Sequence, residues 1–387
     1  MKKIAIFGST GSIGTTLLNI IKKDRKKFVI ILLTANKNYK KLIKQSMLFN
    51  VKNIIITNKK SFLTTSKILK NKNINIYNNF DELQKIFKNK DIDYTMSAIS
   101  GFEGLKPTLN IIKFTKTIAI ANKESIICGW SLIKKKLNKY KTKFIPIDSE
   151  HFSIWSLLDK EKNKNIDKVF ITASGGPFRE YPLRLFKNIS PEKALKHPNW
   201  SMGKKISIDS ATMMNKVFEI IEAKKIFDFN YNQLEILIHP QSYLHAIVKF
   251  NNGLTKLLIH DTSMTIPIFN SIHLDDNIKI KSKHLDINIL NNLNLEVVKK
   301  NRFPIIEVIN KLPNKESLFE TVIVSANDKL VEKFLNKEIK FTDISTILLK
   351  IINLKEFKKL KKIKPKNVEQ VNKIAKYVSL KIDSLSI

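Results

Sequence analysis

The first third of the chain alternates short apolar runs with stretches in which apolar residues recur every three or four positions. The short runs are typical of buried strands, and the longer spacing, as over residues 15–23, is typical of amphipathic helices. Strands that alternate with helices predict right-handed βαβ units around a parallel sheet, and hence a Rossmann-type domain over residues 1–147. The expected strands are residues 3–7, 28–34, 53–57, 94–98, 117–121 and 144–147.

The pattern changes after residue 147. Residues 148–274 are rich in glycine, proline, serine and histidine between strand-like runs, which predicts an α+β catalytic domain. Residues 275–299 carry no repeating pattern and are expected to be a linker. Residues 300–387 are lysine-rich with helical periodicity, which predicts a C-terminal helical domain in a protein of the α/β class. The clearest strand-like runs are residues 168–172, 234–239 and 246–250, and the clearest helix is 318–335.

Charge is the most unusual property of the composition. The 387 residues include 69 Lys and Arg against 34 Asp and Glu, a formal net charge of +35. The lysines are spread over the whole length of the chain. A nucleic-acid-binding protein would need a basic stripe interleaved with aromatic residues, and the sequence shows no such stripe. We expect a solvated basic surface that attracts anionic substrates.

Two further features indicate the cellular compartment. The single cysteine, Cys128, excludes an internal disulfide framework and fits a reducing compartment. The first expected strand begins almost at Met1, so we expect no signal or transit peptide before it. The sequence also lacks a run of about 18 apolar residues, which a membrane-spanning helix would need. A cytoplasmic protein without a membrane segment is expected.

A glycine-rich turn, Gly8-Ser9-Thr10-Gly11-Ser12-Ile13-Gly14, follows the first strand and opens a helix. In this context Gly8 permits a tight turn and Gly11 lets the backbone approach a pyrophosphate, while the helix N-terminus offers N–H groups. The turn therefore predicts a dinucleotide site.

The end of the second strand indicates which dinucleotide is bound. Proteins that bind NAD usually carry an acidic residue there, whereas this chain has Asn36, Lys37 and Asn38. A lysine favours a 2′-phosphate, so we predict NADP(H). Asn122-Lys123-Glu124 follows another strand and is expected at the same sheet edge.

Asp148 and Glu150 follow the last strand of the first domain. If the strand alternation continues, both carboxylates emerge on one side, where they repel each other unless a cation lies between them. Such oxygens are usual ligands of Mg²⁺ or Mn²⁺. Asp148 or Ser149 is equally suited to capping a helix that runs through Trp155 to Leu158. Both interpretations remain open from this segment alone.

Three segments of the second domain carry candidate chemistry. Residues 174–177 form a glycine turn suited to an anion, and residues 197–203, with Trp200, predict a lid over a ligand. Beyond Asp209 and Ser210, a predicted helix places Asn215, Lys216, Glu219 and Glu222 on one face. Because the opposite face is apolar, the polar face must meet either solvent or a site.

Taken together, these segments resemble the 1-deoxy-D-xylulose 5-phosphate reductoisomerase family over nearly the whole chain. The resemblance implies reductive rearrangement of that sugar phosphate to 2-C-methyl-D-erythritol 4-phosphate in isoprenoid biosynthesis, with NADPH, a divalent cation and a homodimer. The motifs that carry it are G-S-T-G-S-I-G at 8–14, A-N-K-E-S at 121–125, D-S-E-H at 148–151, S-G-G-P-F-R-E at 174–180, H-P-N-W-S-M-G at 197–203 and D-S-A-T-M-M-N-K at 209–216.

The resemblance also implies roles for individual residues. As metal ligands it implies Asp148, Glu150 and Glu219, and it adds Lys123 to these as a catalytic residue. As further substrate contacts it implies Ser149, Ser174, His197, Ser210, Asn215 and Lys216. As NADPH contacts it implies Thr10, Gly11, Ser12, Ile13, Asn36, Lys37, Asn38, Asn122, Glu124 and Gly203, with Trp200 and Met202 in the lid.

Three positions depart from the family pattern. Asn36 and Val217 stand where glycine is common, and Thr265 stands at or near the place of a basic residue. The alternative function is another Rossmann-type NADP oxidoreductase, such as a semialdehyde dehydrogenase. That class needs a reactive cysteine, and Cys128 in an apolar helix start is a poor candidate.

Overall fold

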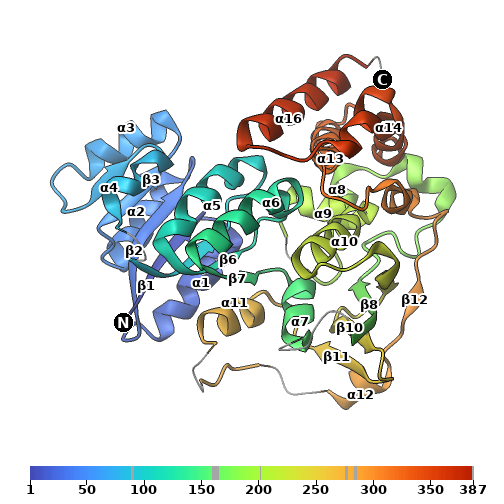
Figure 1. Ribbon diagram of the computed structural model, residues 1–387, viewed down its shortest axis with the longest axis horizontal. Coiled ribbons are helices and arrows are strands. Elements are labelled where there is room, and N and C mark those ends of the chain that lie inside the picture. The colour runs from blue at the N-terminus through green and yellow to red at the C-terminus, as the bar shows by residue number, and fades with distance from the viewer. Residues whose placement is uncertain (89–90, 159–164, 201, 275–277, 283–285, 386–387) are drawn as a thin grey trace. The chain divides into compact units, whose positions relative to one another are not determined.

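The computed structural model describes residues 1–88, 91–158, 165–200, 202–274, 278–282 and 286–385. The chain forms two compact units, each built on a sheet (Figure 1). The first unit contains Met1–Ser125, Leu132–Phe152 and Met264–Lys281, and the second contains Ile126–Ser131, Ser153–Ser263 and Ser282–Ile387.

The sheet of the first unit has seven parallel strands in the order β4-β3-β2-β1-β5-β6-β7. The chain builds outward from β1 in one direction and from β5 in the other, so the order reverses between these two strands. Ligands of open α/β sheets bind beyond the carboxyl ends of the strands at such a reversal. The strands are β1 (Lys2–Phe7), β2 (Phe28–Ala35), β3 (Asn53–Ile56), β4 (Asn75–Tyr77), β5 (Ile92–Ser97), β6 (Thr115–Ile120) and β7 (Lys143–Pro146).

The helices of this unit connect successive parallel strands, as the βαβ pattern predicted. A last helix, α11 (Thr265–Ile272), returns from later in the chain to pack on α1, and its Ser271 hydroxyl lies 2.8 Å from the Tyr94 hydroxyl. The first unit therefore includes residues 264–281, which extend beyond the expected boundary at residue 147. The connecting helices are α1 (Ser12–Lys23), α2 (Tyr39–Leu48), α3 (Lys59–Ile68), α4 (Leu83–Ile86), α5 (Leu105–Ile111) and α6 (Lys123–Tyr140).

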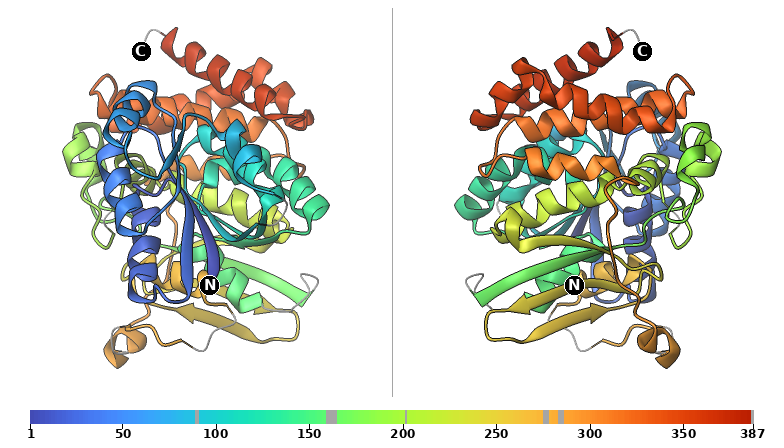
Figure 2. Two further views of the ribbon diagram at one scale, coloured as in Figure 1. Left: turned by 90° about the vertical axis from the view of Figure 1, so that its left-hand side faces the viewer. Right: turned by 90° about the vertical axis from the view of Figure 1, so that its right-hand side faces the viewer.

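The sheet of the second unit has five strands in the order β11-β10-β8-β9-β12, in which only β8 and β9 are parallel. Ile220 and Ala223 of α10 (Met214–Phe227) lie in one core cluster with Val169 and Val248 of the sheet, so this helix covers one face (Figure 2). The strands are β8 (Ile166–Ala173), β9 (Leu234–Ile238), β10 (Leu244–Phe250), β11 (Thr255–Ile259) and β12 (Glu296–Val297), the last within the expected linker.

Helices make up the rest of the second unit. The helix α13 (Phe319–Leu335) packs against α14 (Phe341–Asn353), α16 (Val368–Asp383) and α9 (Lys204–Thr212), so the helices expected in residues 300–387 pack with a helix from an earlier segment. The remaining helices are α7 (Ser149–Leu158), α8 (Pro191–Ala194), α12 (Ile287–Asn291) and α15 (Lys355–Lys358).

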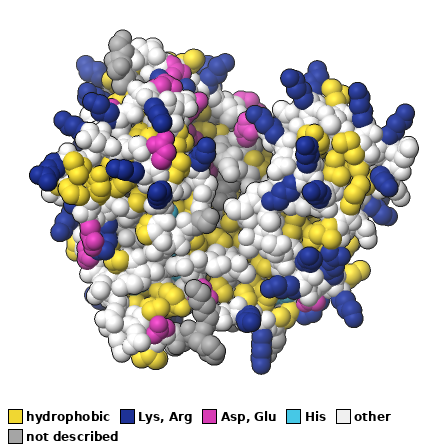
Figure 3. Space-filling model, turned by 180° about the vertical axis from the view of Figure 1, so that it is seen from behind, with side chains coloured by type: hydrophobic (Ala, Val, Ile, Leu, Met, Phe, Trp, Pro, Cys, Tyr) yellow, Lys and Arg dark blue, Asp and Glu magenta, His cyan; other side chains and the backbone are white. Residues whose placement is uncertain are grey.

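On the face that Figure 3 draws, the positive charge is spread rather than gathered in one patch. Figure 3 shows Lys and Arg side chains scattered over one face, with few Asp and Glu among them. In the part of the chain that the structure describes, every helix is too short or too polar to cross a membrane.

A buried ion cluster joins three segments of the second unit. The Lys225 ammonium on α10 lies 3.2 Å from a carboxylate oxygen of Glu320 and 3.5 Å from one of Glu316. Lys225 and Glu320 side chains are 5% and 1% exposed, so neither charge is solvated by water. Glu316 also accepts the backbone N–H of Ser131, just beyond Gly129, where non-helical dihedral angles interrupt α6.

The substitution Lys225→Met tests how much this cluster contributes to the free energy of unfolding. The change leaves the buried Glu320 carboxylate and the partly buried Glu316 carboxylate without their cation, so we expect the free energy of unfolding to fall by about 3–5 kcal/mol. The matched control is Lys249→Met, which removes an exposed pair with Asp167 and should cost less than about 1 kcal/mol. Equal losses in denaturant titrations of the two variants would contradict a structural role for the cluster.

Candidate metal, cofactor and substrate sites

The glycine-rich turn after β1 has the geometry that the sequence predicted. Gly8 has a φ of +73°, and a Cβ there would lie 2.6 Å from the carbonyl oxygen of Ala98. A Cβ on Gly14 would lie 2.5 Å from the Cα of Ser9, so glycine lets α1 start directly against the turn. In the described structure α1 has neither an acidic residue in its first turn nor a side-chain cap, which leaves its N-terminal N–H groups suited to an anion.

The other predicted cofactor residues lie at the carboxyl ends of β2 and β6. Asn38 caps α2 by accepting the backbone N–H of Lys41, so the segment with Asn36 and Lys37 leads directly into that helix. Asn122 caps α6 by accepting the N–H of Ser125 at 2.6 Å, and its amide donates to the carbonyl of Gly101 at 2.9 Å. The same turn that presents Glu124 and Lys123 is thereby fixed to the loop after β5.

Asp148 and Glu150 come together through a helix rather than a strand. The strand β7 ends at Pro146, and α7 begins at Ser149, so the expectation that strand alternation places both carboxylates on one side is wrong. Asp148 accepts the backbone N–H of Glu150 at 3.1 Å and also approaches the ring of His151 at 3.1 Å. Asp148 therefore caps α7, as the second interpretation predicted, and Glu150 lies in the first turn.

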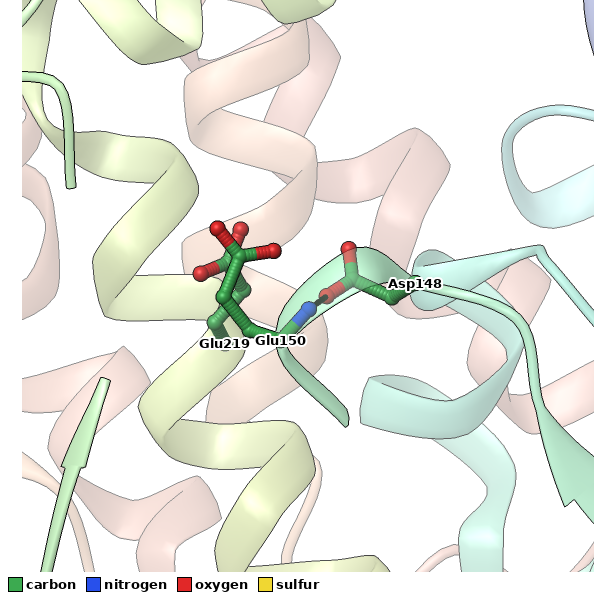
Figure 4. A group of neighbouring side chains, drawn as sticks. All are labelled: Asp148, Glu150 and Glu219. Atoms are coloured by element: carbon green, nitrogen blue, oxygen red, sulfur yellow. Dashed lines mark hydrogen bonds between the residues drawn. The ribbon is translucent and has the colours of Figure 1, made fainter. Parts of the chain in front are cut away.

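A third carboxylate approaches from α10. Ligand oxygens of Asp148, Glu150 and Glu219 all lie within 4.8 Å of one another, and Figure 4 shows the carboxyl groups of Glu150 and Glu219 side by side. The packing of Ile154 and Leu158 of α7 with Ile220 of α10 holds the two helices together one turn away. The capping role and the convergence on Glu219 are compatible, because Asp148 uses one oxygen for the cap.

Three neighbouring carboxylates need positive charge. The Lys216 ammonium lies 2.5 Å from Glu219, which is only 1% exposed, and the Lys123 ammonium lies 3.4 Å from Asp148. These two cations offset part of the repulsion among the three carboxylates. A set of hard, anionic oxygen donors suits Mg²⁺ or Mn²⁺ better than a thiolate-binding metal, so the residues present fit the expected cation.

The polar face of α10 is buried. Lys216, Glu219 and Glu222 are 6%, 1% and 2% exposed. The sequence left open whether this face meets solvent or a site, and the burial shows that it does not meet solvent. Buried charges on one helix face are costly unless they are paired or bind a ligand, which favours a site. Glu222, one turn beyond Glu219, is not in the group of three carboxylates that the described residues form.

A single left-handed residue joins the segments that carry Ser210 and Lys216. Met213, with a φ of +69°, ends α9 and precedes α10, so the chain turns sharply between the two helices. The start of α10 is free of acidic residues in its first turn and presents Asn215 and Lys216. Helix N-terminal N–H groups beside an ammonium are suited to a phosphate.

Ser174 and His197 form a second part of this pocket. The His197 ring accepts the backbone N–H groups of Asn199 and Trp200 at Nδ1, so we assign its proton to Nε2, which lies 3.1 Å from the Ser174 hydroxyl. Ser174 Oγ also accepts the N–H of Gly176 at 3.1 Å. With its oxygen accepting twice, the Ser174 hydroxyl hydrogen remains available to donate to a ligand.

The Gly176 turn packs on the end of α9. A Cβ on Gly176, which has a φ of +67°, would lie 2.9 Å from the carbonyl oxygen of Ser210. The predicted substrate residues Ser174, His197, Ser210 and Lys216 are thus brought together from three segments. Nearby, the Trp200 ring contacts His245 edge-on at 6.3 Å, while Ser201 of the predicted lid lies outside the described residues.

Comparison with known proteins identifies this arrangement. The family model for 1-deoxy-D-xylulose 5-phosphate reductoisomerase matches residues 4–129. The model for the C-terminal domain of this reductoisomerase matches residues 144–227, and a further model for a DXP reductoisomerase C-terminal domain matches residues 260–379. A 1-deoxy-D-xylulose 5-phosphate reductoisomerase of Pelagibacter ubique is 69% identical over 388 residues, covering 100% of both chains. The chain belongs to the 1-deoxy-D-xylulose 5-phosphate reductoisomerase family.

Solved structures of the family agree with the fold. The Zymomonas mobilis reductoisomerase in complex with NADPH is 31% identical and superposes with a TM-score of 0.87, covering 99% of this chain and 98% of that one. A DOX-P reductoisomerase in complex with NADPH, fosmidomycin and magnesium is 30% identical, with a TM-score of 0.90 and the same coverage. The resemblance and fold class predicted from the sequence are confirmed.

The departures from the family pattern fall at different structural positions. Asn36 lies in the segment between β2 and α2, and Val217 is fully buried in α10 beside Lys216. Thr265 is the first residue of α11, which belongs to the first unit. The structure gives no account of why Thr265 replaces a basic residue.

Sequence reasoning missed residues that support the candidate sites from behind. His151 is buried against Asp148, and the Asp209 carboxylate, 2% exposed, accepts the Asn327 amide at 2.7 Å, which ties α9 to α13. Lys41 and Gln45 of α2 hold the glycine-rich turn. Lys41 and Gln45 are four residues apart and so lie on one face of α2, but nothing in the sequence identifies the turn as their partner.

The pKa of His197 offers a test of this pocket. Burial and then the nearby Lys216 ammonium lower it from 6.5 to about 4. Between pH 6.5 and 4 the unfolded chain binds a proton that the folded protein excludes, so stability present above pH 6.5 is lost as the pH falls. We expect His197→Gln to lose less stability than the wild type over this interval in urea titrations.

His239 and His260 also have lowered pKa values because of burial, and they contribute equally to both proteins. The difference between the two pH profiles therefore isolates His197. Parallel profiles from pH 7 to pH 4 would contradict a neutral, buried His197.

Proposed function

We propose that this chain converts 1-deoxy-D-xylulose 5-phosphate, NADPH and a proton to 2-C-methyl-D-erythritol 4-phosphate and NADP⁺. The observation that carries the proposal is the convergence of Asp148, Glu150 and Glu219 one helical turn from Lys216. It places a hard-cation site and a phosphate-type site beside each other on the same helix, α10. The family membership of the chain supports the same reaction and its place in non-mevalonate isoprenoid biosynthesis.

The roles of the residues follow from their chemistry. Asp148, Glu150 and Glu219 would hold Mg²⁺ or Mn²⁺, which when bound supplies Lewis-acid stabilisation of negative charge on substrate oxygens. Lys123, whose ammonium lies 3.4 Å from Asp148, places a further positive charge beside them. Ser149 donates to Glu150 at 2.6 Å and fixes the orientation of that carboxylate.

The phosphate end supplies binding energy rather than chemistry. Ser174, His197 and Ser210, with Asn215 and Lys216, would hold the dianion and orient the carbon skeleton for rearrangement. The segment 197–203 would close over the substrate and exclude water before hydride transfer.

The cofactor is proposed to bind the first unit. The diphosphate would lie on the turn from Thr10 to Ile13, and the 2′-phosphate beside Asn36, Lys37 and Asn38. Asn122, Glu124 and Gly203 would complete the cofactor contacts. Relatives solved with NADPH and with magnesium support both the cofactor and the cation.

The alternative dehydrogenase chemistry is not favoured. A semialdehyde dehydrogenase attacks its substrate with a cysteine thiolate, and such a residue must be accessible. Cys128 is 0% exposed within α6, so it does not meet that need.

The decisive experiment follows NADPH absorbance with 1-deoxy-D-xylulose 5-phosphate and Mg²⁺ or Mn²⁺. We expect turnover with the wild type, and for Glu150→Gln a fall in kcat of about 100-fold or more, because a charge that stabilises the transition state is lost. NADPH affinity should stay within about twofold, since the cofactor residues lie on other segments.

The matched control is Glu369→Gln on α16, an exposed carboxylate that should leave turnover unchanged. No turnover by folded wild-type protein would refute the proposed reaction. Equal loss of NADPH binding and activity in Glu150→Gln would instead assign Glu150 a structural role.

We also propose a homodimer in the cytoplasm. The strand β11 is an edge of the five-stranded sheet. Leu254, just before this strand, is 58% exposed, and Leu257, on the strand, is 45% exposed. Unprotected apolar edges favour pairing with another chain. Sedimentation should give a dimer at micromolar concentration and a monomer for Leu257→Lys, and a monomeric wild type would contradict the proposal. Cell fractionation tests the location.

A further inference from the structure

The ammonium of Lys41 lies against the glycine-rich turn. It donates to the carbonyl of Thr10 at 2.9 Å and to the Thr15 hydroxyl at 2.8 Å. Thr15 in turn donates to the carbonyl of Gly11 at 2.6 Å, so its oxygen is free to accept from Lys41. One lysine on α2 therefore connects the turn with the first turns of α1.

Gln45, one turn further along α2, holds the residue before Thr10. Its amide donates to the carbonyl of Ser9 at 2.9 Å, and its side-chain oxygen accepts from the Ser9 hydroxyl at 2.9 Å. The C=O and N–H of a trans peptide point in opposite directions. Tying the Ser9 carbonyl to α2 therefore turns the N–H of Thr10 away from α2.

The charge on Lys41 has no acidic counterpart. Its ammonium is half-buried and bonded to neutral oxygens, and within the described ranges no carboxylate forms an ion pair with it. The first turn of α1 also lacks acidic residues. A half-buried positive charge at the back of an anion-binding turn strengthens the field on the anion.

We propose that Lys41 is a positioning residue that determines cofactor affinity, by holding the Thr10 peptide and adding positive charge behind the turn that takes the cofactor diphosphate. The proposal rests on the proposed function, because it takes NADPH as the ligand of this turn. It assigns Lys41 to the diphosphate, which NADPH and NADH share, and leaves the 2′-phosphate to Lys37.

Dissociation constants of NADPH and NADH, measured by fluorescence without substrate, test this assignment. For Lys41→Met we expect both constants to rise by the same factor, about tenfold, since a charge-assisted contact is lost. For Lys37→Met we expect only the NADPH constant to rise. In turnover, Lys41→Met should raise the KM for NADPH and leave kcat unchanged.

Two further variants separate charge and position from general effects. Lys41→Arg keeps the charge and the donors, and should retain affinity within about threefold. Lys40→Met removes an exposed lysine next to it and should leave both constants within about twofold. Thermal unfolding of each variant shows whether the fold is retained.

The outcomes are distinguishable. Unchanged dissociation constants for Lys41→Met, or an equal rise for Lys40→Met, would overturn the role of Lys41. A rise confined to NADPH would move Lys41 to the 2′-phosphate and overturn the diphosphate assignment. A wild-type protein that binds neither nucleotide would refute the proposed function itself.

Discussion

The burial of the Glu219 carboxylate constrains the second unit more than any other interaction. A charge that is 1% exposed cannot be solvated by water, so the protein has to surround it with partners. Lys216 supplies the nearest positive charge, and Asn215 donates a hydrogen bond to the other oxygen. Two more carboxylates then approach the same point, an arrangement that is unfavourable unless a cation is shared.

The helix α10 relates the two ends of the proposed substrate site. Lys216 and Glu219 are three residues apart, which is a rise of about 4.5 Å along a helix. The phosphate-type groups therefore lie within one turn of the carboxylates, and the rigidity of one helix sets their separation. His197 and Ser174 belong to neighbouring segments. The pKa of His197 is lowered, so its imidazole is neutral and orients the Ser174 hydroxyl by a hydrogen bond.

Much of the fold was predictable because the parallel strands are short, apolar and regularly spaced. Strands such as β1 and β8 were located within one or two residues of their observed bounds. The polar strand β4, the edge strand β11 and the two-residue strand β12 escaped, since their sequences do not alternate clearly. The return of α11 to the first unit depends on long-range packing with α1, which local periodicity does not encode.

The sequence predicted which residues form the candidate site, but it did not predict how the chain brings them together. The sequence placed Glu219 beside Lys216 on one helix face, but it expected Asp148 and Glu150 to meet by strand alternation. A helix cap brings them together instead, because Asp148 bonds the N–H of Glu150. The supporting contacts of Lys41, Gln45 and Asn327 could not be foreseen, since each joins segments that are distant in the sequence.

The left-handed residue Met213 has a consequence for how this stretch can change over evolution. Each residue of an α-helix advances the direction of a side chain by about 100°. A single insertion or deletion between Met213 and Glu219 would rotate the carboxylate away from Asp148 and Glu150 while leaving Ser210 in place. The number of residues in this stretch is therefore fixed by the angular relation between the two halves of the site.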